Sequence, residues 1–175
     1  VAVKVIKPRL GRPESQKTII RNEVKILEQI SKFPKCFPNI VCIYDYIEDE
    51  SGYFYIVMEY IEGKTIDETK DTSTFREVIE GLHHLHSFGI IHRDIKPGNI
   101  LVTSGGHAKI VDLGVGCSIR PESGISDCSQ LAGTELYLDP LLYLERISTS
   151  QFKSDVFSAG MTFYEVVTGK LPPFY

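Results

Sequence analysis

The sequence predicts an α+β fold made of two lobes. Strand patterns with a single helix come first along the chain, and helical patterns dominate afterwards. A polar connector near residues 60–64 separates these two stretches. The 175 residues are enough for one ordinary domain, or for a compact two-lobed piece of a larger one.

The first stretch contains three strand patterns and one helix pattern. Residues 1–6 are apolar and β-branched, which predicts a strand. From Ser15 to about Ser31 apolar residues recur at helical spacing, with Ser15 as the expected N-cap. Residues 40–47 and 53–60 predict two further strands, which a polar turn joins.

The second stretch is mainly helical. Residues 62–73 are polar and predict a connector. A helix is expected from Phe75 until Gly89 stops it. Residues 100–111 predict a hairpin over a Ser-Gly-Gly turn. Residues 155–167 are apolar nearly all round, which predicts a buried helix capped by the following glycine.

Bulk composition excludes several classes of function. The net charge is −4 and no run of Lys or Arg occurs, so we expect no nucleic-acid partner and no binding to anionic lipid. No apolar stretch approaches the ~20 residues that span a bilayer. We expect no signal peptide, because the first residues are strand-like. These observations predict a cytoplasmic protein without a membrane partner.

Neither the cysteines nor the histidines predict a metal site. The cysteines form no Cys-x-x-Cys pair and stand at no zinc-ligand spacing with a histidine. We expect all of them to be free thiols in a reducing cytosol. Three clustered histidines have no carboxylate or cysteine at ligand spacing, so we expect exposed residues on a helix surface. The residues concerned are Cys36, Cys42, Cys117, Cys128, His83, His84 and His86.

Lys4 and Glu23 are two charged residues on apolar faces. Lys4 stands among valines in the first strand, and Glu23 shares the apolar face of the first helix. A charge there is costly to bury unless it is paired. The residues alone leave two interpretations open: the two side chains pair with each other, or both reach solvent at the edge of the fold.

Residues 92–99 place a carboxylate, an ammonium group and an amide within six positions. These are Asp94, Lys96 and Asn99, and apolar segments on both sides would hold the loop between them rigidly. Asp112 follows the predicted hairpin, which could return its carboxylate to the same site. Two carboxylates, an amide and a lysine suit Mg²⁺ together with phosphate.

These features resemble a eukaryotic-type protein kinase of the Ser/Thr type. Seven segments match the family's motifs in order along nearly the whole chain, and together they are specific. They are residues 1–4 (third-strand lysine motif), Glu23 (helix-C glutamate), 57–60 (strand before the hinge), 92–99 (catalytic loop), 112–114 (metal-binding triplet, with Leu113 for the usual Phe), 133–137 (end of the activation segment) and 155–160 (start of helix F, with Phe157 for the usual Trp).

The resemblance implies a kinase-like fold and a division of the chain. Residues 1–61 would form a small β-rich lobe with the hinge, and residues 62–175 a larger, mainly helical lobe. Both lobes would be partial. The chain starts within a strand pattern without Met and ends just past a helix pattern, which predicts a fragment. The Gly-rich loop and the final helices of the family would lie outside it.

The resemblance also implies roles for individual residues. Asp94 would accept or orient the proton of the substrate hydroxyl. Lys96 would stabilise the γ-phosphoryl group. Asn99 and Asp112 would hold Mg²⁺. Asp155 would tie down the backbone of the catalytic loop from behind.

An ATP site follows from the same resemblance. Lys4 would touch the α- and β-phosphates, and Glu23 would brace it. The adenine pocket would consist of Ala2 and Leu101 on the two ring faces, Met58 at the back, and the backbone of Glu59 and Ile61 along the edge.

Residues near the catalytic loop resemble those of kinases that act on Ser or Thr of protein substrates. Lys96, two positions after Asp94, is similar to Ser/Thr kinases, as is Thr134. Tyrosine kinases usually carry an Arg-containing variant of the loop. The resemblance therefore implies a signalling enzyme whose substrates are proteins with Ser or Thr acceptors.

Arg93 resembles the arginine of kinases that are switched by phosphorylation of the activation loop. We expect an upstream kinase to act on Ser129 or Ser126, within an aperiodic segment rich in Ser and Gly. A phosphate there could pair with Arg93 and order the loop. The other interpretation is that these serines are polar loop residues without such a role.

Two other functions compete with a protein kinase. The first is a pseudokinase or scaffold module, favoured by Asp139-Pro140-Leu141 in place of the family's Ala-Pro-Glu. The intact set of catalytic residues argues against it. The second is a small-molecule kinase such as an antibiotic phosphotransferase. Those enzymes usually lack the segment at residues 93–96 and the Gly-Thr ending of the activation segment.

Overall fold

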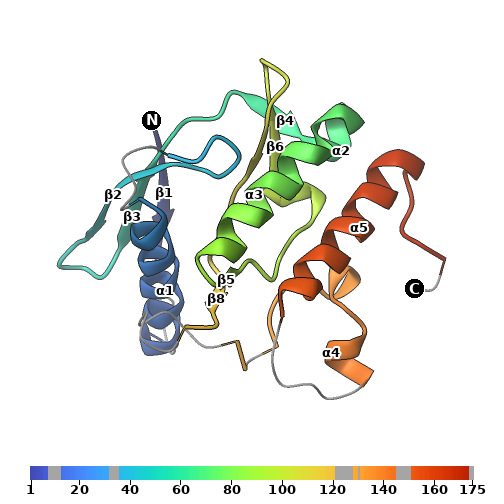
Figure 1. Cartoon of the computed structure of the whole chain (residues 1–175). Helices are drawn as coiled ribbons and strands as arrows, with labels where there is room; N and C mark the ends of the chain where they lie inside the picture. Colours follow the sequence, from blue (N-terminus) through green and yellow to red (C-terminus); the bar gives the residue numbers. More distant parts are fainter. Residues whose placement is uncertain (8–12, 32–35, 121–127, 130, 145–150, 174–175) are drawn as a thin grey trace.

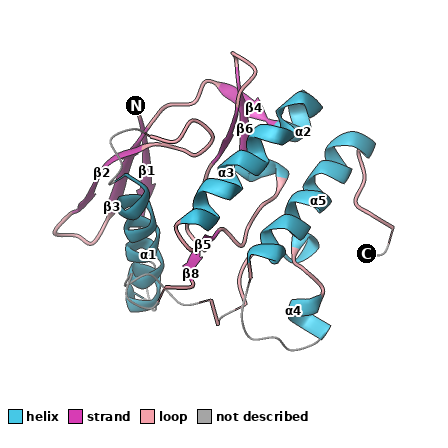
Figure 2. Cartoon of the chain, in the orientation of Figure 1, coloured by secondary structure: helices cyan, strands magenta, loops and turns pink. Residues whose placement is uncertain are grey.

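The computed structural model of the chain describes residues 1–7, 13–31, 36–120, 128–129, 131–144 and 151–173. Its elements form the expected α+β fold of two lobes (Figure 1). The smaller lobe, on the left of Figure 1, holds a three-stranded sheet and one long helix. The larger lobe holds the remaining helices and several short strands (Figure 2).

The sheet of the smaller lobe is antiparallel, in the order β1-β3-β2. Its strands are β1 (Ala2–Ile6), β2 (Ile43–Glu48) and β3 (Phe54–Met58), and α1 (Pro13–Ser31) lies beside it (Figure 1). Successive side chains of a strand point to opposite faces. Lys4 therefore shares the half-buried face of β1 with Ala2, while Val3 and Val5 are exposed.

The larger lobe is built around two helices and a hairpin. The hairpin β6–β7 belongs to a sheet of order β4-β6-β7, and β5 pairs with β8. The strands are β4 (Gly63–Thr65), β5 (Ile90–Ile91), β6 (Ile100–Thr103), β7 (Ala108–Ile110) and β8 (Cys117–Ser118). The helices are α2 (Ile66–Thr69), η1 (Thr72–Thr74), α3 (Phe75–Ser87), η2 (Pro97–Asn99), η4 (Glu135–Tyr137), α4 (Leu141–Leu144) and α5 (Phe152–Thr168).

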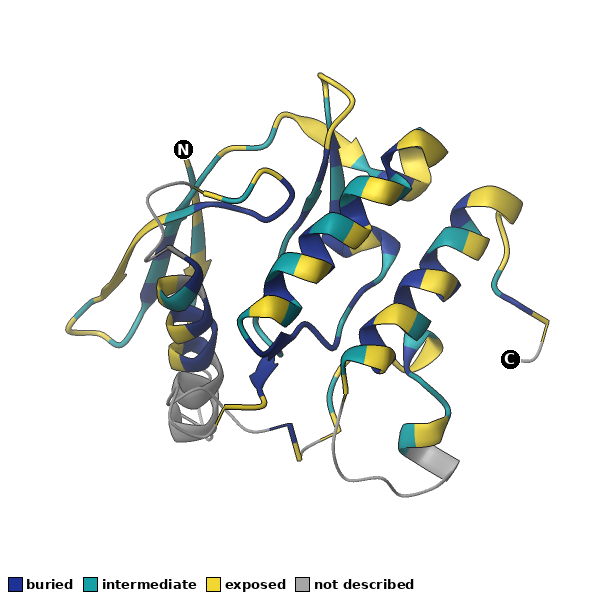
Figure 3. Ribbon diagram, in the orientation of Figure 1, coloured by how far each residue is buried: buried dark blue, intermediate teal, exposed yellow. Residues whose placement is uncertain are grey.

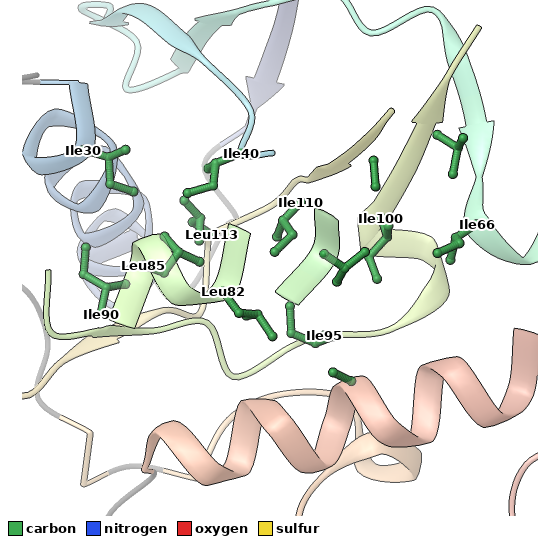
Figure 4. Close-up of a cluster of buried hydrophobic side chains, with 14 of the residues drawn as sticks. Ile30, Ile40, Ile66, Leu82, Leu85, Ile90, Ile95, Ile100, Ile110 and Leu113 are labelled. Atoms are coloured by element: carbon green, nitrogen blue, oxygen red, sulfur yellow. The ribbon is translucent and has the colours of Figure 1, made fainter. Parts of the chain in front are cut away.

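One cluster of buried apolar side chains joins α1, α3, the hairpin and α5 (Figures 3 and 4). It includes Ile26, Ile30, Leu82, Leu85, Ile95, Ile100, Ile110, Leu113, Ala159 and Val166. Ile95 lies inside the predicted catalytic loop and Leu113 directly follows Asp112, and both are essentially inaccessible to solvent. The apolar core thus anchors the backbone next to the polar residues of the site.

Several predicted boundaries were wrong by a few residues. The first helix begins at Pro13, so Ser15 is inside it rather than at the N-cap; proline is favoured in the first turn because no intrahelical partner is needed there. The strand predicted from residue 40 begins at Ile43, because Val41 bonds instead to Ile110 of the hairpin. The polar connector contains β4 and α2, since β4 pairs with β6.

The expectation of four free thiols was wrong. The structure pairs Cys36 with Cys42 and Cys117 with Cys128 in disulfides, with Cα–Cα separations of 5.4 Å and 5.2 Å. Spacing along the chain could not reveal the second pair, because β8 and the segment at residue 128 meet only through tertiary packing. Within the part of the chain that the structure describes, every helix is too short or too polar to cross a bilayer.

Candidate active site

Lys4, Glu23 and Asp112 meet where three separate elements converge. Lys4 on β1 places Nζ 2.8 Å from Oε1 of Glu23 on α1. The same Nζ lies 3.0 Å from Oδ1 of Asp112, which follows the hairpin. Glu23 is only 4% exposed. Of the two interpretations that the sequence left open for Lys4 and Glu23, the structure shows the pair. We call these three residues the lobe-spanning network.

Burial and charge oppose each other in this network. Burial raises the pKa of Glu23, and the nearby Lys4 ammonium offsets this only in part, so the pKa stays above its ordinary value. Burial alone would lower the pKa of Lys4, but Glu23 and then Asp112 hold it above its usual range. Burial would likewise raise the pKa of Asp112, but Lys4 keeps it below the ordinary value. The cation therefore stays charged with an ionised Asp112 beside it.

Residues 92–99, the catalytic loop of the sequence prediction, gather a second set of polar groups. Lys96 Nζ lies 2.8 Å from Asp94 Oδ2. The hydroxyl of Thr134 donates to Asp94 Oδ1 at 2.6 Å and accepts from Lys96 Nζ at 2.7 Å. Asn99 donates its side-chain amide to Asp94 Oδ2 at 2.9 Å and to the Asp94 carbonyl at 2.8 Å. Three polar side chains are thus held around one carboxylate.

The electrostatic state of Asp94 follows from these contacts. Burial would raise the pKa of the carboxyl, but hydrogen bonds from Lys96 and Thr134 and the charge of Lys96 outweigh it and hold the pKa below the ordinary value. Asp94 is therefore an ionised carboxylate at neutral pH, with its side chain 14% exposed.

Asp155 on α5 supports the loop from below. Its carboxylate is fully buried and accepts the backbone N–H groups of His92 at 2.9 Å and Arg93 at 2.8 Å. His86 Nε2 lies 2.8 Å from the same carboxylate.

The prediction that all three clustered histidines are exposed holds only for His83. His84 is half-buried, with its ring 4.5 Å from that of Phe37. The side chain of His86 is 16% exposed and faces Asp155, because it lies on the packed side of α3.

The hairpin returns Asp112 to the loop as predicted. The N–H of Val111 donates to the Asn99 carbonyl at 2.9 Å, which sets Asp112 beside the end of the loop. Arg93 and Asp112 both adopt left-handed backbone, with φ of 66° and 62°. This conformation costs a residue with a side chain about 1 kcal/mol or more. Such strain clusters at functional sites.

A cavity of about 400 Å³ opens between the two lobes. Every residue predicted for the nucleotide pocket lines it, as do Asn99 and Asp112. Those pocket residues are Ala2, Lys4, Glu23, Met58, Glu59, Ile61 and Leu101. Asp94 and Lys96 stand beyond the lining, next to Asn99. At the predicted hinge, the N–H of Glu59 donates to the Cys42 carbonyl at 2.9 Å, which fixes the backbone beside the cavity.

Sequence reasoning missed other residues of the lining. These are Val41, Ile43, Tyr60, Gly98, Val111 and Leu113. Val41 and Ile43 belong to a predicted strand whose sequence does not indicate which of its faces would line the cavity. Val111 could have been found, because it directly precedes the aspartate that was assigned to the site.

The predicted partnership of Arg93 with the activation loop takes another form in this structure. Arg93 is buried, and its Nε donates to the carbonyl of Val115 at 2.6 Å. Ser129 is exposed. Ser126 lies outside the described residues. A phosphate at Ser129 remains a prediction.

The fold has two lobes, with the Lys4–Glu23 pair on one side of the cavity and the loop of Asp94, Lys96 and Asn99 on the other. This combination defines the kinase class of proteins. The comparison with family models agrees: the model described as "Protein kinase domain" matches residues 1–175. The chain belongs to the protein kinase domain family.

Known relatives carry names of Ser/Thr kinases. The chain is 32% identical to human serine/threonine-protein kinase STK11, over 98% of this chain and 41% of that protein. It is 35% identical to the probable serine/threonine-protein kinase PknB of Bifidobacterium longum, over 99% of this chain and 27% of that protein. It is 33% identical to serine/threonine-protein kinase PrkC of Bacillus subtilis, over 77% of this chain and 22% of that protein. The chain spans less than half the length of these relatives.

Proposed function

We propose that this chain carries the catalytic centre of a protein Ser/Thr kinase, which transfers the γ-phosphoryl group of Mg-ATP to Ser or Thr hydroxyls of protein substrates. The observation that carries the proposal is the placement of two lysine–carboxylate clusters next to each other. Lys4, Glu23 and Asp112 pair within the lining of the cavity. Asn99, also in the lining, donates to Asp94, which pairs with Lys96 just beyond it.

The cavity suits a purine nucleotide. Ala2 and Leu101 supply apolar surface from opposite lobes, and Met58 lies in the same lining. The carbonyl of Glu59 and the backbone of Ile61 would bond the adenine edge. Lys4 would hold the α- and β-phosphates, because its charge is maintained by two carboxylates and its side chain remains 36% exposed.

The donor set fits Mg²⁺. Hard oxygen ligands are what this ion prefers, and it is usually bound by one or two protein groups together with substrate phosphates. Asp112 offers an ionised carboxylate and Asn99 an amide oxygen, while the Asn99 nitrogen is already engaged by Asp94. Among the described residues no group of three or more His, Cys, Asp or Glu forms a metal cage, in keeping with a site completed by phosphate. When bound, the ion would neutralise charge on the transferred group.

Asp94 would take the role of the residue that accepts or orients the proton of the acceptor hydroxyl. Its lowered pKa keeps it ionised. Lys96 would neutralise charge developing on the phosphoryl oxygens. The hydroxyl of Thr134, 2.6 Å from Asp94, shows that an aliphatic hydroxyl can reach this carboxylate.

The names of the relatives support protein Ser/Thr acceptors. We further propose that residues 1–61 act as the smaller lobe with the hinge and residues 62–175 as the larger lobe. Phosphorylation at Ser129 or Ser126 by an upstream kinase and a cytoplasmic location belong to the same proposal. A pseudokinase, the alternative, would bind partners or nucleotide without turnover.

Turnover separates these functions. The full-length protein, before and after treatment with an activating kinase, is incubated with γ-labelled ATP, Mg²⁺ and a generic Ser/Thr protein substrate. We expect phosphoryl transfer, and a loss in kcat of about 10²- to 10⁴-fold in Asp94→Asn, with nucleotide binding retained. Asp67→Asn changes an exposed aspartate on α2 and serves as the matched control. A wild-type protein that stays silent after activation would favour the pseudokinase.

A further inference from the structure

The disulfide between Cys117 and Cys128 lies near the catalytic loop, and the proposed phosphoryl transfer makes no use of it. Both cysteines are buried, at 0% and 4% exposure. They form a small apolar cluster with Ile91, against which Phe152 packs. Cys117 lies on β8 opposite Ile91 on β5. Ile91 is the residue directly before the catalytic loop.

The two halves of this disulfide are held differently. Cys117 is fixed through its backbone, since β8 pairs with β5. The preceding carbonyl, that of Gly116, accepts the side-chain amide of the buried Asn22 on α1 at 2.7 Å. Cys128 lies outside any helix or strand, one residue before the exposed Ser129. The disulfide therefore links an anchored strand to the segment that leads toward Thr134.

We propose that Cys117 and Cys128 form a redox modification site, which a peroxide closes and a dithiol reductant opens, and whose closed state holds residues 128–129 beside the strand that leads into the catalytic loop. In reducing compartments disulfides are usually transient and regulatory rather than permanent. A pair placed between a fixed strand and a loop segment fits that use.

The chemistry balances with hydrogen peroxide as oxidant. One thiolate attacks a peroxide oxygen, forms a sulfenic acid and releases hydroxide, which takes up a proton to become water. The second thiolate attacks the sulfenic sulfur, the S–S bond forms, and a second hydroxide leaves and becomes water. The two thiols lose two electrons and two protons in total. A dithiol reverses the change by attacking one sulfur and then resolving the mixed disulfide.

Contacts lead from this site to the catalytic loop. Phe152, which packs on the sulfur cluster, stacks on His86 with ring centroids 4.6 Å apart. His86 contacts Asp155, which holds the N–H groups of the loop. Opening the disulfide would free residue 128 at one end of this chain of contacts, while β8 stays in place through its own backbone bonds.

The experiment uses the full-length protein without denaturant. It is treated with excess dithiothreitol or with hydrogen peroxide, free thiols are blocked with N-ethylmaleimide, and cysteine-containing peptides are mapped by mass spectrometry. We expect a linked Cys117–Cys128 peptide after peroxide and maleimide on both cysteines after reduction. Hydrogen exchange at the amides of residues 131–134 should be slower in the closed form by about tenfold, since closing a short loop typically stabilises by at least that factor.

Two variants sharpen the result. Cys128→Ala keeps an apolar side chain but cannot form the disulfide. In this variant the amides of residues 131–134 should exchange as fast as in the reduced wild-type protein, both after dithiothreitol and after peroxide. Cys36→Ser combined with Cys42→Ser removes the other disulfide and should keep the full difference between the two states. If Cys128→Ala fails to fold, the two redox states of the unaltered protein still decide the matter.

Three results would overturn the proposal. A link that survives excess dithiothreitol would make the disulfide a permanent crosslink, and maleimide on both cysteines after peroxide would mean that no disulfide forms. Equal exchange of residues 131–134 in both states would mean that the link holds nothing. Only one consequence rests on the proposed function: a KM for the protein substrate that rises on reduction, with the KM for ATP unchanged. Labelling and exchange report on the site even in a protein without turnover.

Discussion

The catalytic loop and the lobe-spanning network face the same cavity but are assembled in different ways. Within the loop, Asp94, Lys96 and Asn99 are close neighbours in sequence. The buried carboxylate of Asp155 supports the loop by accepting two of its backbone N–H groups. In the lobe-spanning network, Lys4, Glu23 and Asp112 come from three elements and meet only through side chains. The geometry of the loop is therefore largely local, whereas that of the network depends on how α1, β1 and the hairpin are placed.

This difference shows where the site can be regulated. A shift of α1 would separate Glu23 from Lys4 while leaving the loop intact, because the main supports of the loop come from α5 and from its own residues. A shift of α5 would remove the support that Asp155 gives to the loop, while leaving Glu23 paired with Lys4. Substitutions can test the two dependences separately.

The largest expected effect is on the support of the loop. Asp155→Ala leaves two buried N–H groups without their acceptor, which should lower the free energy of unfolding by about 3 kcal/mol or more. Asp155→Asn keeps one acceptor oxygen and should cost less. Urea unfolding followed by circular dichroism measures both. A loss below about 0.5 kcal/mol in Asp155→Ala, the range of ordinary surface changes, would mean that the loop supports itself.

A smaller effect on stability, with a clear effect on rate, is expected in the lobe-spanning network. Glu23→Gln keeps the shape but removes a charge that burial already disfavours. The free energy of unfolding should change by less than about 1 kcal/mol, while misplacement of Lys4 should lower kcat on the order of tenfold to a hundredfold.

Glu28 is an exposed glutamate on the same helix, so Glu28→Gln is the matched control for Glu23→Gln. Calorimetry and initial rates with saturating ATP provide the two measurements. Unchanged turnover in Glu23→Gln would show that the pair contributes only to packing.

The smallest expected effect concerns the pH dependence of the loop. The proposed role of Asp94 requires its carboxylate form, so activity should fall as pH drops through its lowered pKa. Thr134→Ala removes one of the hydrogen bonds that lower this pKa, so the acid limb of kcat should move to higher pH. The stability that ionised Asp94 contributes is present above its unfolded pKa and is lost as pH falls through its folded pKa, so in the variant this contribution should be smaller and its loss should be complete at a higher pH.

Thr134→Ser retains the hydroxyl and should follow the wild-type pH profile. Rates and unfolding free energies between pH 3 and pH 8 would be compared for the three proteins, a range that spans the ordinary carboxyl pKa of about 3.9. An unmoved acid limb in Thr134→Ala would mean that the charges beside Asp94, chiefly Lys96, set its state without the Thr134 hydroxyl.

The sequence predicted the loop better than its surroundings. Asp94, Lys96 and Asn99 could be assigned because their spacing is local and their chemistry belongs to one reaction class. For Lys4 and Glu23 the residues alone left pairing and solvent exposure open, and only the resemblance to protein kinases favoured the pair. The α+β class and both long helices of the larger lobe followed from periodicity, although α5 begins at Phe152, three residues before the expected start.

What the sequence could not predict depends on tertiary placement. Cys128 meets Cys117 only after β8 has paired with β5. His86 faces Asp155 only because α3 and α5 pack together, and nothing in a cluster of three histidines singles it out. β4 forms because β6 offers it a partner, which overrides the polar character of its sequence.

The left-handed backbone at Arg93 and Asp112 sets two selection pressures against each other. Glycine adopts this conformation without steric cost, so laboratory evolution for heat resistance alone would drift toward glycine at both positions. Selection for turnover would keep the guanidinium and the carboxylate there instead. The residues recovered at 93 and 112 from a mutagenised library would therefore report which of the two properties that library had been selected for.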